Sequence, residues 1–214
     1  MPIFAAPFGT VPILEGPELN AALAPLIAQR SSTAHRDPLA PDPLCFRSRE
    51  DLFEWPDEAA VRLRQAMLEG LVRLTQAVNA YTDEQFDAFS VQARARFALV
   101  RPNGCWPICT VPLATWCAFY CVSAPPPVAA RPDSAVLRLY ENRFGFMFMD
   151  PTNCRMRAPY TPGHHVWSPV AGTMVIFPGT IAHEVALNRA DSDLVLVKAR
   201  VRFAVPGVQE LPPW

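Results

Sequence analysis

The sequence contains no hydrophobic run long enough to cross a bilayer and no cluster of basic residues. A membrane-spanning helix needs about 18–20 consecutive apolar residues, and although half of the residues are hydrophobic, every apolar stretch is shorter than that. A net charge of −1 without a Lys/Arg patch lacks the electrostatic footprint that nucleic acid or an anionic membrane requires. We therefore expect small molecules or proteins as partners, no nucleic acid and no membrane. A homodimer is compatible with these properties.

The N-terminus lacks the basic region of a secretory signal, and prolines interrupt its apolar residues. This pattern predicts an opening strand or arm, and we expect a cytoplasmic protein. In that compartment thiols stay reduced. We therefore expect the six cysteines to be reduced, and not to form a disulfide framework.

Glycine is scarce and proline is abundant, with nine glycines against 24 prolines. Proline removes a backbone donor and cannot lie inside a central strand, so its frequency predicts short strands with many fixed loops. A chain of 214 residues suits one domain, 1–214. We expect an N-terminal arm and helices over about residues 1–90 and a β core over about residues 91–206.

Two segments before residue 90 have helical periodicity. Residues 18–29 have helical spacing, although Pro25 should bend or interrupt the helix, and residues 30–46 have no periodicity and are expected to form a loop. The clearest pattern predicts a helix from about residue 57 to 80, because five apolar residues recur every three or four positions. These are Leu63, Met67, Leu71, Leu74 and Val78.

From residue 96 onward, short β-prone runs separated by turn residues predict a sandwich or barrel, with the helices covering one outer face. The runs are RFALVR, TWCAFYCV, AVLRLY, FGFMFM, TMVIF, IAHEVAL and DLVLVKARVRF. In the last run, alternate side chains from residue 194 to 202 belong to two different faces of the predicted strand. Its all-apolar face, from Val195 to Val201, should pack under the helices, and the opposite face should direct Lys198 and Arg200 toward the barrel interior or its mouth.

Three segments carry a resemblance to a known family. They are FRSREDLFEWPDEAAVRLRQAMLEGL at residues 46–71, NGCWPICTVPLATWCAFYCV at 103–122 and SPVAGTMVIFPGTIAHEV at 168–185. In this order they resemble a bacterial group of iron(II)/2-oxoglutarate-dependent oxygenases, and the likeness covers most of the chain. It implies a mainly β double-stranded β-helix, a jelly-roll and cupin-like fold, with N-terminal helices packed on one sheet.

The resemblance also implies a metal site. In such enzymes an upstream His-x-Asp or His-x-His pair and a distal histidine bind Fe(II), with open positions for 2-oxoglutarate and dioxygen. Alignment through the motif puts Cys109 and Val111 at the upstream positions and His183 at the distal one. Valine cannot bind a metal, so the ordinary triad is broken. His183 and Cys109 are the candidate catalytic and metal-binding residues.

The family's 2-oxoglutarate anchor, a basic residue about ten positions after the distal histidine, falls on Asp193. Lys198 or Arg200 would replace it if the last strand is longer or shifted. Arg143 is a further candidate contact to an acidic ligand, with a structural role as its alternative. The resemblance implies Fe(II) and 2-oxoglutarate as cofactors, and the broken motif leaves a different metal or no cofactor open.

Each candidate also has a purely structural interpretation. His183 could be a strand histidine whose ring is hydrogen-bonded to a backbone carbonyl, and Cys109 could be a small hydrophobic residue of the core. The basic residues of the last strand suit a solvated face. Two C-x3-C spacings, formed by Cys105, Cys109, Cys117 and Cys121, are candidates for a soft-metal site that binds copper(I) or zinc, with core packing as the alternative. Adjacent residues of an extended chain point opposite ways, so at most one of His164 and His165 would serve a single site, and Asp150 suits a turn.

Three functional hypotheses follow. The first, placed narrowly ahead, is a dioxygenase-like oxidoreductase with an altered metal site that acts on a small molecule or a bound biosynthetic intermediate. The second is a pseudo-oxygenase, a metal-free jelly roll that binds a small ligand or performs acid–base chemistry through His183. The third is an interaction domain whose pocket is filled by side chains. The first two require Cys109 and His183 to converge on one cavity lined by the last strand.

Overall fold

The computed structural model describes residues 5–141, 163–204 and 212–214. Three of the sequence predictions lie outside these ranges: the strand FGFMFM, the ligand contact at Arg143 and the turn at Asp150. Within them the chain forms ten strands, three α-helices and two 3₁₀ turns.

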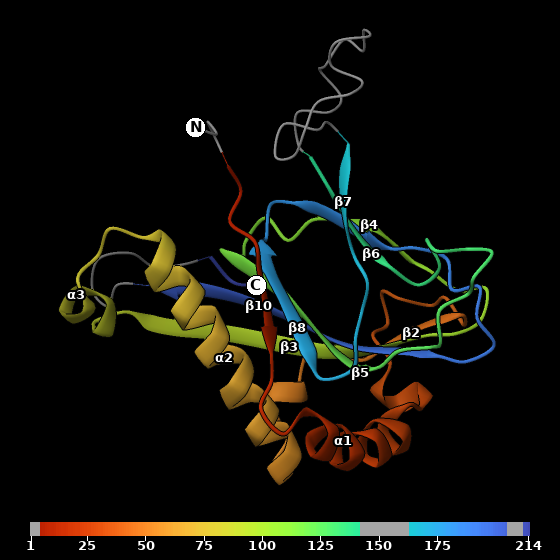
Figure 1. The fold of residues 1–214 in the computed structure, drawn as a ribbon. Coiled ribbons are helices and arrows are strands. Elements are labelled where there is room, and N and C mark those ends of the chain that lie inside the picture. Colours follow the sequence, from red (N-terminus) through yellow and green to blue (C-terminus); the bar gives the residue numbers. More distant parts are fainter. Residues whose placement is uncertain (1–4, 142–162, 205–211) are drawn as a thin grey trace, which may run out of the picture.

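The strands form two antiparallel sheets that face each other (Figure 1). The six-stranded sheet has the order β1 (Gly9–Pro12), β8 (Thr173–Pro178), β5 (Trp116–Ser123), β10 (Leu194–Ala204), β3 (Ser90–Val100) and β2 (Cys45–Arg47). The four-stranded sheet has the order β4 (Trp106–Cys109), β9 (Ala182–Val185), β6 (Leu137–Tyr140) and β7 (His164–Trp167). The predicted mainly β, double-stranded β-helix is confirmed.

The helices all lie before the long strand β3. They are α1 (Gly16–Arg30), α2 (Glu58–Val78) and α3 (Asp83–Asp87), and the 3₁₀ turns are η1 (Thr33–His35) and η2 (Leu52–Glu54). Bounds for α2 agree with the predicted helix. The expected interruption at Pro25 is wrong: α1 continues through this exposed residue, because the buried face of the helix, which includes Leu23 and Ile27, is anchored in the core.

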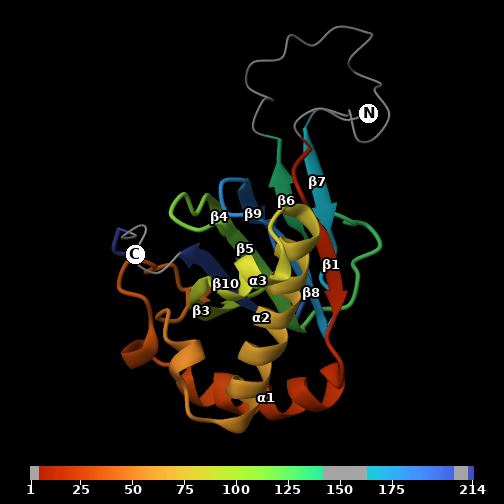
Figure 2. The ribbon, with the colours of Figure 1, turned by 90° about the vertical axis from the view of Figure 1, so that its left-hand side faces the viewer.

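One core lies between the helices and the outer face of the six-stranded sheet (Figures 1 and 2). The apolar face of β10 contributes Val197, Ala199 and Val201 to this core, which also contains Leu63 and Met67 of α2. The strict alternation of β10 therefore places its apolar residues under the helices, as the sequence predicts.

A second core fills the space between the two sheets. On β5, Cys117, Phe119 and Cys121 share the inner face and are fully buried, which agrees with plain packing for the two cysteines. All five described cysteines are free. Within the described ranges, no helix has the length and apolar content needed to span a membrane.

Candidate functional site

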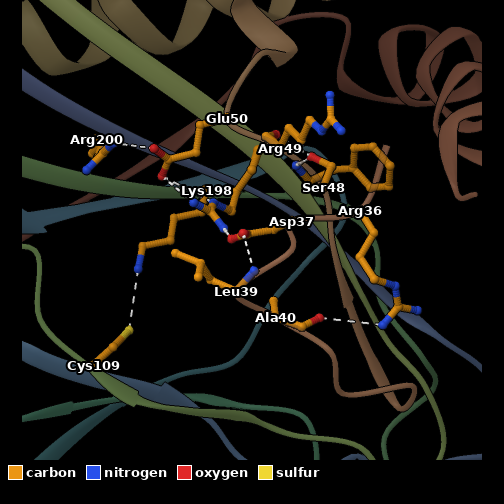
Figure 3. A network of polar contacts seen from close by, with 12 residues as sticks. Arg36, Asp37, Leu39, Ala40, Ser48, Arg49, Glu50, Cys109, Lys198 and Arg200 are labelled. Atoms are coloured by element: carbon orange, nitrogen blue, oxygen red, sulfur yellow. Dashed lines mark hydrogen bonds and ion pairs between the residues drawn. The ribbon is translucent and has the colours of Figure 1, made fainter. Parts of the chain in front are cut away.

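Three strands bring Cys109, His183 and Lys198 together. Strands β4 and β9 are neighbours in the four-stranded sheet, where Cys109 lies opposite His183 and its Sγ is 3.5 Å from Nε2. From β10 in the facing sheet, Lys198 reaches across the interior, and its Nζ lies 2.8 Å from His183 Nε2. The same Nζ lies 3.5 Å from Cys109 Sγ, the contact drawn in Figure 3. The sequence singled out all three residues, and the structure makes them one cluster.

The hydrogen bonds of His183 define its tautomer. Nδ1 lies 2.8 Å from the carbonyl oxygen of Ile181, and a carbonyl only accepts, so Nδ1 carries the hydrogen. Nε2 is then free to accept a hydrogen bond from the Lys198 ammonium. Burial and, after it, the charge of Lys198 lower the pKa of His183 to about 3. The imidazole is therefore neutral near pH 7.

Lys198 and Cys109 line a cavity of about 240 Å³ between the sheets. Four basic and two acidic side chains line it, which gives the wall a net charge of +2 in a chain whose net charge is −1. The basic residues are Arg47, Arg96, Lys198 and Arg200, and the acidic residues are Asp37 and Glu50. Such a wall attracts anions.

The two carboxylates are already paired with two of the arginines. Arg96 donates to Asp37 and lies 2.6 Å from Glu50, and Arg200 donates to the same Glu50 (Figure 3). Burial raises the pKa of Asp37, but the backbone N–H of Leu39 and the charge of Arg96 outweigh it and leave that pKa below its usual value. The carboxylates are thus committed to this network.

Lys198 and Arg47 have no such counter-ion. In the described part of the chain, neither has a carboxylate within ion-pair distance. Lys198 Nζ lies 5.0 Å and the Arg47 guanidinium 5.5 Å from the ring centre of Trp106. Nε of Arg47 and Nε of Arg200 are buried without a hydrogen-bond partner among these residues. Burying a cation whose N–H donors have no acceptor costs folding free energy, and a bound anion would remove that cost by accepting these hydrogen bonds.

Lys198 is also the only lysine in the chain, beside eighteen arginines. By periodicity alone it is one of several basic residues on the last strand, and its being the single lysine is the sequence signal that distinguishes it. No comparable sequence signal marks Asp37, Glu50, Arg47 and Arg96. Their shared position depends on tertiary contacts between the segment around β2 and strands β3 and β10.

The described residues do not fit an iron site of the facial-triad type. Such a site needs three protein ligands, whereas Cys109 and His183 supply two donors and Val111 lines the same cavity with a hydrocarbon side chain. The Nε2 lone pair is engaged by an ammonium, which would repel a dication at that position. No group of three or more potential metal-binding side chains occurs within the described ranges, and the soft-metal alternative at the cysteines gains no support from them.

The other residues that the sequence suggested differ in their position relative to the cavity. His164 and His165 are exposed on β7, outside the cavity. Asp193, which the family spacing placed at the anchor position, directly precedes β10 and does not line the cavity. Arg200 lines the cavity with Lys198, as expected for alternate residues of one strand.

Comparison with known proteins shows the fold. No family model and no curated protein matches the sequence. A prolyl-4-hydroxylase from Pseudomonas putida has a TM-score of 0.62 at 16% identity, over 92% of this chain and 93% of that chain. The non-heme alpha ketoglutarate dependent carbocyclase SnoK from nogalamycin biosynthesis has a TM-score of 0.60 at 11% identity, over 95% and 84%. AviO1 from Streptomyces viridochromogenes Tue57 has a TM-score of 0.59 at 17% identity, over 97% and 93%.

Proposed function

We propose that this chain is a pseudo-oxygenase: a metal-independent protein with the oxygenase fold, whose cavity binds a small anionic molecule. The observation that carries the proposal is the position of the Lys198 ammonium, 2.8 Å from His183 Nε2 and 3.5 Å from Cys109 Sγ. These are the two donors that the resemblance assigns to iron. An internal cation in this place supplies one positive charge without a metal.

Unsatisfied donors define the ligand class. The Nε–H groups of Arg47 and Arg200, which have no partner among the described residues, and the ammonium of Lys198 favour carboxylates or other oxyanions, which accept several charge-assisted hydrogen bonds at once. A cavity of about 240 Å³ is smaller than the roughly 300–1,000 Å³ of drug-sized sites. We therefore favour a small metabolite. An open cavity of this size also argues against the interaction-domain hypothesis, which requires a filled pocket.

Calorimetric titration tests this function. Succinate, malonate and glutarate are titrated into the full chain in EDTA-containing buffer and, separately, after loading with Fe(II) without oxygen. We expect at least one to bind equally well in both conditions. Lys198→Met and Arg47→Gln should each weaken that binding by about ten-fold or more, as for loss of a charge-assisted hydrogen bond. Arg189→Gln is the matched control, because it removes an exposed arginine outside the cavity.

The same titrations separate the alternatives. Binding that requires Fe(II), together with stoichiometric metal lost in His183→Ala, would replace this proposal by the altered-site oxygenase. Binding of none of the three acids in either condition would also overturn it.

A further inference from the structure

The amine of Lys198 has the surroundings of a reactive group and not only of a charge. It is 9% exposed and lies at the cavity wall, where a small molecule can reach it, with the ring centres of Trp106 and Phe119 5.0 and 5.4 Å from Nζ. His183, a neutral acceptor, lies directly against it. A lysine at a pocket wall with an acceptor directly against its nitrogen has the arrangement that proteins use for amine nucleophiles.

The cavity also contains the group that would hold a substrate for such an amine. Arg200 is two residues along β10, on the same face as Lys198, so the two Cα atoms are roughly 7 Å apart. Arg47 lines the same cavity, and its guanidinium and the Lys198 amine both lie over the ring of Trp106. A molecule whose carboxylate binds these arginines presents its other end to the amine, and the functional group that an amine attacks is a carbonyl.

We infer that Lys198 is a covalent site, where its amine condenses with the carbonyl of a small oxo acid to form an imine. This inference rests on the proposed anion-binding function and assigns its ligand class more closely. It assigns no metal to the reaction.

The step balances without an oxidant or reductant. One proton of the Lys198 ammonium passes to His183 Nε2, 2.8 Å away, and the free amine attacks the carbonyl carbon to form the C–N bond. The former carbonyl oxygen takes one of the two protons left on this nitrogen, and His183 returns its proton to the nitrogen across the same 2.8 Å contact. Transfer of a second nitrogen-bound proton to this hydroxyl releases water. Ammonium plus carbonyl thus gives a protonated imine plus one water, and the charge at Lys198 is unchanged.

The protein favours return of the proton. Burial, the larger cause of the lowered pKa of His183, disfavours an imidazolium, so the ring gives the proton back to the neighbouring nitrogen. His183 thereby holds the proton only while the amine attacks. Its Nδ1–H stays bonded to the carbonyl of Ile181 throughout, which holds the ring in place.

The chain has so few amines that each adduct can be assigned to a single group. Besides Lys198, only the N-terminal amine can form an imine. The full chain is incubated in EDTA with glyoxylate, pyruvate or 2-oxoglutarate and sodium cyanoborohydride, which converts an imine to a stable secondary amine. Peptide mapping by mass spectrometry then measures adduct at each amine.

We expect at least one oxo acid to label Lys198 about ten-fold or more faster than the N-terminal amine, the internal control. Lactate, which lacks the carbonyl, should give no adduct and should slow labelling by competition. His183→Gln should slow labelling roughly 100-fold, within the range for loss of proton transfer. In Lys198→Arg the adduct at this position should disappear, because a guanidinium is not a nucleophilic amine, while the N-terminal amine should still be labelled.

Labelling confined to the N-terminal amine, or equal at Lys198 in folded and urea-unfolded protein, would overturn the covalent site. If succinate still binds in that case, the anion-binding function stands alone. If succinate binding is also absent, both proposals fail together.

Discussion

At the scale of single residues, His183 combines two properties that are seldom found together: it is fully buried, and its nearest polar neighbour besides a carbonyl is a cation. Burial is the larger cause of its lowered pKa, and the ammonium of Lys198 adds to it. A histidine in this state accepts hydrogen bonds at any physiological pH. This explains how Lys198 can stay against Nε2 without a carboxylate between them.

This arrangement predicts how stability depends on pH. The unfolded chain takes up a proton at His183 below about pH 6.5, whereas the folded chain does so only near pH 3. Between these values the unfolded state binds more protons, so stability falls as the pH falls. At about 1.36 kcal/mol per pKa unit, the loss between pH 6.5 and pH 5 is roughly 2 kcal/mol.

Urea unfolding at pH 5, 6 and 7 measures this loss. His183→Gln should be less stable than the wild type at pH 7 but should lack the roughly 2 kcal/mol decline that the histidine contributes. His164→Gln, which removes an exposed histidine of β7, is the control and should keep the wild-type slope. A wild-type slope in His183→Gln would contradict the buried neutral histidine.

At the scale of secondary-structure elements, the site depends on three strands from two sheets. Register alone places Cys109 opposite His183, because β4 and β9 are antiparallel neighbours. Lys198 comes from the facing sheet, and sheets pack about 10 Å apart, a gap that a long lysine side chain can cross. An ammonium from β10 thus lies where the donors from β4 and β9 meet.

Removing the ammonium should therefore expose a metal-binding geometry that the strands still hold. We expect wild-type protein to bind Co(II) weakly, Lys198→Ala to bind it more tightly, and Lys198→Ala/Val111→Asp, which adds a third donor, to bind it most tightly. The near-ultraviolet band of thiolate bound to Co(II) reports ligation by Cys109. Adding His183→Ala to the double variant should abolish the band. Equal affinity in wild type and Lys198→Ala would show that the ammonium does not block the donors.

Part of this site could be predicted from the sequence, and whether a residue could be placed depended on the kind of contact that positions it. Strand β10 and helix α2 are encoded by local periods of two and about 3.6, so the direction of Lys198 was predictable. The pairing of Cys109 with His183 was expected from the family resemblance. Asp37 lies in the segment without periodicity and Glu50 in the stretch between that segment and helix α2, and only tertiary contacts to Arg96 and Arg200 place them at the cavity.

At the scale of the whole molecule, the two cores share one sheet, so neither can open alone without disturbing the other. Strand β5 shows this directly, because alternate residues face the helix core and the inter-sheet core: Tyr120 lies in the first, and Cys117 and Cys121 lie in the second. Exposing either thiol requires the two sheets to separate. Its chemical accessibility therefore reports on global unfolding.

The five cysteines within the described ranges divide into two groups on this basis. Burial raises the pKa of Cys45, Cys117 and Cys121 to about 12, and all three are fully buried, whereas Cys105 and Cys109 are partly exposed. Only the thiolate reacts with alkylating agents. At neutral pH we expect iodoacetamide to modify Cys105 and Cys109 in the folded protein, and the three buried thiols only after global unfolding.

Peptide mapping across a urea series measures both groups against the unfolding curve from circular dichroism. Succinate at about 100 times its Kd should shift the curve and the reactivity of the three buried thiols together, by about 2.7 kcal/mol. It should also slow modification of Cys109 without urea, because Cys109 lines the cavity, and leave Cys105, which does not line it, unchanged. Modification of Cys117 or Cys121 well below the unfolding midpoint would mean that the sheets separate locally, and the two cores would then not form one cooperative unit.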